Sequence, residues 1–125
     1  MEPELFDQLL HLASTEVSTT KAKLPGNLRP RAATITTTFE LKPNADLGTD
    51  GIKSHALGLF LGESMTAPPC NHPQPTQIIL FLKNLWECIG SDKAAFLEET
   101  HITHLHELGH HFGFDEYDLQ KRYLN

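Results

Sequence analysis

The 125-residue sequence has few cysteines, no basic tract and no long apolar run, and each of these scarcities excludes a class of protein. Cys70 and Cys88 form neither a disulfide framework nor a zinc or redox pattern, and Cys88 is expected to pack in the fold with Trp86. Ten Lys and Arg against sixteen Asp and Glu give a net charge of −6, which excludes a general binding surface for nucleic acid or anionic membranes. No stretch of about 18 apolar residues is present, so no membrane-spanning helix is expected.

The N-terminal segment also lacks the features of a secretory signal. Residues 1–5 contain neither a basic region nor the start of an apolar one. Together with the cysteine usage, this favours a soluble, reduced, cytoplasmic protein. The length predicts a single domain over residues 1–125, because domains commonly contain roughly 100–150 residues.

The spacing of apolar residues predicts an α+β domain. Helical periodicity predicts a helix from Pro3 to about Thr19. Short apolar or β-branched runs predict strands at 32–41, 56–61 and 77–82, and a short helix is expected over 84–89. A cap signal at Asp92 predicts a last helix over 92–112, which Gly113 should end because it tolerates a left-handed backbone.

Histidine is abundant in this sequence, whereas cysteine is scarce. The chain has eight histidines, and five of them lie between residues 101 and 111. They are interleaved with apolar residues inside the chain, so they are not an expression tag. His101 is expected in the core with a hydrogen-bond partner, His104 nearer the surface, and His111 beside the C-terminal end of the helix dipole.

Residues 106–110 form an H-E-x-x-H motif on the last predicted helix. His106 and His110 lie one turn apart on one face, so both imidazoles can bind the same zinc ion. Glu107 should lie beside the ion without binding it, where its carboxylate can take a proton from metal-bound water. The three residues therefore predict a catalytic zinc site rather than a structural one.

A third protein ligand is expected after Gly113, which would reverse the chain at the end of the helix. Glu116 lies three residues further on and can return to the ion through its carboxylate. Asp115 is the alternative, with a shorter side chain. Water would fill the fourth position. Tyr117 is a candidate for stabilising an oxyanion because it lies close to this turn.

The same helix should separate a polar stripe from a core-facing one, because residues advance by about 100°. The expected polar stripe comprises Glu99, Thr103, His106, Glu107 and His110. The expected core-facing stripe comprises Ala94, Leu97, Leu105, Leu108 and Phe112. A helix with ligands on its non-core side is typical of a cleft-lining helix.

The segment His-Glu-Leu-Gly-His-His-Phe-Gly-Phe-Asp-Glu at 106–116 resembles the H-E-x-x-H-x-x-G-x-x-D segment of the small bacterial zincin-like metallopeptidases, or mini-zincins. Thr103 also fits this pattern, and weaker similarity extends over much of the chain. The resemblance implies a minimal zincin-like fold with an N-terminal helix, a small mixed sheet and a metal-binding helix near the C-terminus. It also implies Zn²⁺ as cofactor and a metal ligand at Glu116, where the family more often has Asp.

Motif and resemblance together predict a zinc metallopeptidase that hydrolyses a peptide or protein substrate, with Glu107 as general base. An extended peptide could lie along the strand at 56–61.

Two alternatives stay open. The first is a metal-binding interaction module without turnover. The second is an endoribonuclease, because residues 113–116 are also similar to the Gly-Tyr-Asp-His end of bacterial enzymes that mature ribosomal RNA. The net charge of −6 disfavours the second. No nucleic-acid or membrane partner is expected.

Overall fold

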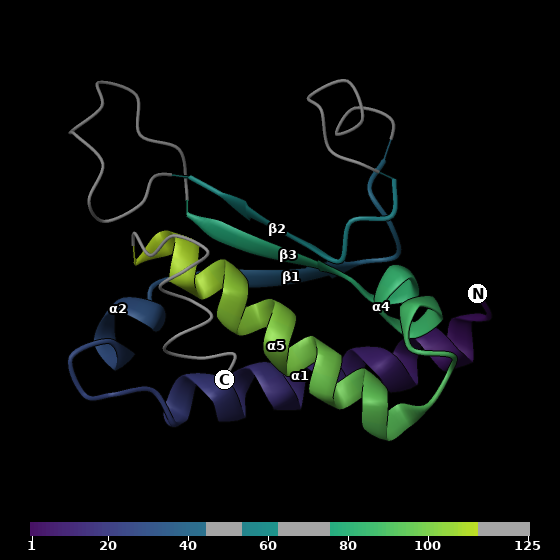
Figure 1. The fold of residues 1–125 in the computed structure, drawn as a ribbon, viewed down its shortest axis with the longest axis horizontal. Helices are drawn as coiled ribbons and strands as arrows, with labels where there is room; N and C mark the ends of the chain where they lie inside the picture. The colour runs from purple at the N-terminus through teal and green to yellow at the C-terminus, as the bar shows by residue number, and fades with distance from the viewer. Residues whose placement is uncertain (45–53, 63–75, 113–125) are drawn as a thin grey trace.

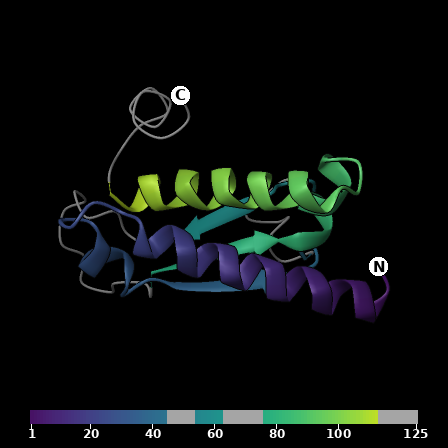
Figure 2. The ribbon, with the colours of Figure 1, turned by 90° about the horizontal axis from the view of Figure 1, so that it is seen from below.

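The computed structural model describes residues 1–44, 54–62 and 76–112. It has an α+β fold in which two long helices accompany a small mixed sheet (Figure 1). The elements in chain order are α1 (Pro3–Ala22), α2 (Arg29–Ala32), β1 (Thr36–Glu40), β2 (Gly58–Leu61), β3 (Gln77–Phe81), α4 (Leu82–Cys88) and α5 (Lys93–His111). Helix α5 lies across β3 and β2, and α1 runs beside α5 (Figures 1 and 2). The predicted fold class is confirmed.

The sheet has the order β1-β3-β2, so β3 is central. Strand β1 pairs with β3 in parallel, and β2 pairs with β3 antiparallel. The continuous apolar run of β3 fits this position, because Ile78 to Phe81 are all buried. Strand β2 is an edge strand, and it is the strand nearest the motif-bearing part of α5 among those described.

All three predicted strands were too long, and the second begins at Gly58 rather than at residue 56. The first was expected from residue 32, but residues 29–32 form α2 and the strand begins at Thr36. Proline in the first turn of α2 removes no helical hydrogen bond, so Pro30 permits this short helix. The third was expected to reach Leu82, which instead begins α4. There the Lys83 N–H donates to the Leu41 carbonyl at 3.0 Å, and the chain leaves the sheet.

The hydrophobic core joins α1, α4 and α5 to the inner face of the sheet. Its buried members include Leu9, Ala13, Val17, Ile78, Leu80, Leu85, Phe96, Leu105 and Leu108. The rings of Trp86 and Phe96 pack edge-on, with centroids 6.0 Å apart. Cys88 was expected to pack in the fold, but it is exposed at the end of α4. No helix in the described ranges is long and apolar enough to cross a membrane.

The predicted start of α5 is confirmed, but the expected core-facing stripe was wrong at its first two positions, because Ala94 is exposed and Leu97 is only partly buried and lies outside the core. The Asp92 carboxylate accepts a hydrogen bond from the Ala94 N–H at 3.1 Å and so caps the helix. Ala94 itself is exposed, and Phe96 occupies the core in its place. The buried stripe continues through Leu105 and Leu108, as expected.

Two histidines of α5 exchange the environments that were predicted for them. His104, expected near the surface, is fully buried, because this face of α5 packs toward α1. His101, expected in the core, has a side chain that is 41% exposed. Its Nδ1 lies 2.9 Å from Thr20 Oγ1, so the expected hydrogen-bond partner is present, and 3.3 Å from Glu16 Oε1. His101 therefore connects α5 to α1 at the edge of the core.

The buried His104 predicts a loss of stability in acid. Burial lowers its pKa to about 3, with smaller contributions from the positive charges of Lys21 and His101. In the unfolded chain a histidine pKa is about 6.5. Between these values the unfolded state binds more protons, so the free energy of unfolding must fall as the pH decreases through this window.

We expect His104→Leu to reduce this decrease between pH 7 and pH 5, because the buried titratable group is removed. Urea denaturation in the presence of a chelator measures it. His11→Leu, which changes an exposed histidine on α1, should retain the wild-type pH dependence. Equal slopes for wild type and His104→Leu would contradict the assignment.

Candidate functional site

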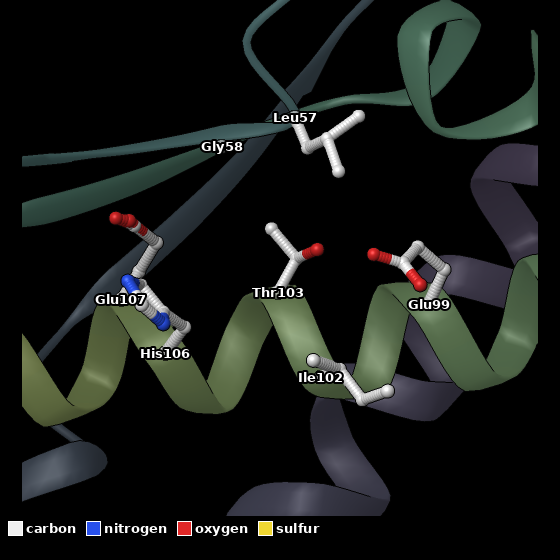
Figure 3. Close-up of a pocket in the computed structure, with 7 residues that line it drawn as sticks. All are labelled: Leu57, Gly58, Glu99, Ile102, Thr103, His106 and Glu107. Atoms are coloured by element: carbon white, nitrogen blue, oxygen red, sulfur yellow. The ribbon is translucent and has the colours of Figure 1, made fainter. Parts of the chain in front are cut away.

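A cleft of about 330 Å³ lies between the start of β2 and the motif-bearing face of α5 (Figure 3). The strand side contributes Leu57 and Gly58, and the helix contributes Glu99, Ile102, Thr103, His106 and Glu107. All five helical residues lie within about two turns on one side of α5, as the helical period requires. The cleft therefore combines one end of the edge strand with most of the predicted polar stripe.

The two histidines of the motif lie together on α5. The ring centroids of His106 and His110 are 4.8 Å apart, with their planes inclined at 79°. Both side chains are partly buried. Two neighbouring imidazoles are a nitrogen donor pair that suits zinc, so the described part of the predicted ligand set fits this ion.

Glu107 is more buried than the predicted polar stripe implied. Only 8% of its surface is exposed, and Thr103 one turn earlier is 9% exposed. Both were expected on the open side of α5, but β2 covers them. Figure 3 shows the Glu107 carboxylate directed toward the strand and away from the axis of α5. The general-base candidate thus lies at the floor of the cleft.

Gly58 permits this close approach of strand and helix. A methyl group at Gly58 would lie 2.8 Å from Thr103 Cγ2, 3.3 Å from Leu80 Cδ2 and 3.4 Å from Glu107 Cγ. Only a residue without a Cβ fits at the shortest of these distances. Gly58 was not among the predicted site residues, although a glycine inside an apolar strand often marks close backbone approach.

One of the remaining predicted site residues lies within the described part of the chain, and the others lie outside it. His111 lies in the last turn of α5 as predicted, and its ring centroid is 5.9 Å from that of Phe60 in β2. Gly113 and the expected ligands and oxyanion candidate after it (Asp115, Glu116, Tyr117) lie outside the described residues. Among residues 1–44, 54–62 and 76–112, no group of three His, Cys, Asp or Glu side chains could hold a metal.

The chain matches the sequence model of a known family. The sequence model of a family described as zincin-like metallopeptidase matches residues 33–124, which is well over half of the chain. The matched range contains the whole sheet, α4, α5 and the H-E-x-x-H motif. No curated protein matches the chain.

The contact at Gly58 predicts a specific steric cost. Gly58→Ala should lower the free energy of unfolding by about 1–3 kcal/mol, because the new methyl group overlaps Thr103 Cγ2. Thr103→Ser removes that methyl carbon and should recover part of the loss in the double variant. A double-mutant cycle by urea denaturation measures the coupling.

Gly26→Ala is the matched control for the Gly58 variant. Its nearest neighbour is the end of the flexible Arg29 side chain at 3.4 Å, so its cost should be small. Strictly additive effects of Gly58→Ala and Thr103→Ser would show that this contact does not set the spacing between β2 and α5.

Proposed function

We propose that this chain, which belongs to the zincin-like metallopeptidase family, is a zinc-dependent peptidase that cleaves a peptide or protein substrate. One observation carries the proposal: Glu107 lies buried at the floor of a cleft beside His106, and an edge strand forms the opposite wall. A general base, a metal-binding pair and a strand edge are the three parts that peptide hydrolysis by a metalloenzyme needs in one place.

His106 and His110 would hold the zinc ion, and their proximity on α5 supports this. We propose Glu116 as the third protein ligand and Asp115 as the alternative, both from the segment after Gly113. When bound, zinc polarises a substrate carbonyl and makes a water molecule more acidic.

In this proposal Glu107 moves the proton. Its carboxylate accepts a proton from the attacking water and afterwards donates it to the nitrogen of the leaving amine. Burial between β2 and α5 limits the orientations of the side chain, so its oxygens stay directed into the cleft. Glu107 would therefore act as both general base and general acid.

The substrate would bind as an additional strand. Within the described residues β2 pairs only with β3, so its other edge has backbone groups available for an extended peptide. The cleft adjoins this strand at Leu57 and Gly58. A peptide on β2 would therefore bring a backbone carbonyl close to Glu107 and His106.

We expect about one zinc ion per chain in protein purified without a nickel column. His106→Ala should lose most of the zinc, because it removes a ligand. Glu107→Gln should keep zinc and reduce peptide cleavage by at least about 100-fold, because it removes proton transfer. Metal analysis and mass spectrometry of a digested peptide mixture measure the two effects.

These measurements separate the alternatives. Zinc binding without cleavage by the wild type would favour the metal-binding interaction module. Less than a tenth of an equivalent of zinc, with no uptake on titration, would remove the basis of the proposal. If Glu107→Gln lost zinc as completely as His106→Ala, the role given to Glu107 would be wrong.

The third ligand gives a separate prediction. Glu116→Ala should weaken zinc binding far more than Asp115→Ala, because Asp115 would only accept a hydrogen bond near the site. Loss of such a supporting group typically weakens metal binding by roughly 10–100-fold. Glu116→Asp should retain zinc. Competition with a chromogenic chelator compares the variants, and a larger effect for Asp115→Ala would move the ligand by one residue.

A further inference from the structure

Glu99 is a charged side chain in the cleft for which the proposed peptidase chemistry has no use. It lies on α5 eight residues before Glu107, which corresponds to about 12 Å along the helix axis. Figure 3 shows its carboxylate beside Thr103, with Glu107 on the other side of Thr103 along the cleft. The side chain is partly buried.

The position of Glu99 excludes it from the proposed zinc site. The midpoint between His106 and His110 is nine residues further along α5, or roughly 13 Å along the axis. A carboxylate ligand must come within about 2.0–2.2 Å of zinc. Glu99 cannot span this distance while α5 stays helical, so its charge must serve another purpose or none.

Two acidic residues of the helices have a basic partner, and Glu99 is not one of them. Glu87 lies 3.9 Å from Lys83, and Glu16 lies 3.3 Å from His101. Within the described part of the chain Glu99 belongs to neither pair, and neither Lys nor Arg lines the cleft. The charge of this carboxylate is therefore available to a positively charged group on a ligand.

The walls beside Glu99 fit the rest of a long basic side chain. Leu57 and Ile102 also line the cleft and offer apolar surface. Lys and Arg commonly pack their methylene groups on such a surface while the charged end reaches a polar partner. A neutral apolar side chain would use the walls but leave the carboxylate without a counter-charge.

We propose that Glu99 makes the cleft selective for peptides that carry Lys or Arg about three or four residues from the scissile bond. The inference rests on the proposed function, because it assumes an extended peptide along β2. Such a peptide advances about 3.4 Å per residue, so the 12 Å between Glu99 and Glu107 corresponds to three or four residues. The overall charge of −6 also favours the approach of cationic peptides.

The first test measures binding, which does not depend on turnover. The probe is an end-blocked nonapeptide with one central Arg in an Ala and Ser background, compared with citrulline or Glu at that position. Calorimetry on the zinc-loaded full chain, with Glu107→Gln present in every sample so that the probe is not cleaved, should show about two- to fivefold tighter binding of the Arg peptide than of the citrulline peptide, as for a partly exposed ion pair. The preference should shrink as the salt concentration is raised.

Two isosteric variants assign this preference to a residue. Glu99→Gln should abolish the discrimination between Arg and citrulline. Glu98→Gln removes the same charge from the neighbouring, exposed position on α5 and should retain it. Absence of the preference when Glu99 is present, or its persistence in Glu99→Gln, would overturn the inference.

The second test separates this inference from the proposed function. Digestion of a peptide mixture should give cleavage sites enriched in nearby Lys or Arg, and Glu99→Gln should lose the enrichment while cleavage continues. Binding selectivity without cleavage would refute the peptidase and keep the subsite. Glu107-dependent cleavage without basic enrichment would keep the peptidase and refute the subsite.

Discussion

The backbone of Gly58 lies directly against Thr103 and Glu107, and the geometry of the cleft depends on this contact between an edge strand and a helix. With a larger residue at this position, the strand, the helix or the Thr103 side chain would have to shift. A shift of the strand away from α5 would leave Glu107 more exposed and the cleft wider. The contact thus determines both the burial of the general-base candidate and the distance between the two walls.

The central strand holds this contact in place. Leu80 belongs to β3 and to the core, and its Cδ2 is also among the nearest atoms to a methyl group at Gly58. On the far side, Phe96 and Leu108 of α5 are fully buried in the same core. The helix is therefore fixed from the side opposite the motif, which leaves Glu107 buried and His106 only partly so.

Much of this arrangement could be predicted from local sequence signals. The N-terminal helix, the Asp92 cap and the H-E-x-x-H spacing on α5 depend on residues close together in the chain, and the match to the zincin-like metallopeptidases confirms the family. The burial of His104 and Glu107 could not be obtained in this way. Each depends on which distant element covers that face of α5: α1 in the first case and β2 in the second.

The environment of each polar residue on α5 depends on these two packing contacts, one with α1 and one with β2. His104 faces the core, where burial lowers its pKa to about 3 and keeps the ring neutral at physiological pH. Glu107 lies at the boundary under β2, where low exposure strengthens its interaction with any nearby charge. Glu99 lies two turns away in the partly buried end of the cleft. Because a single helix carries all three, a rotation of α5 about its axis would change the burial of all three at once. The rotational setting of α5 against β2 and α1 is therefore the constraint that links the stability of the core to the chemistry of the cleft.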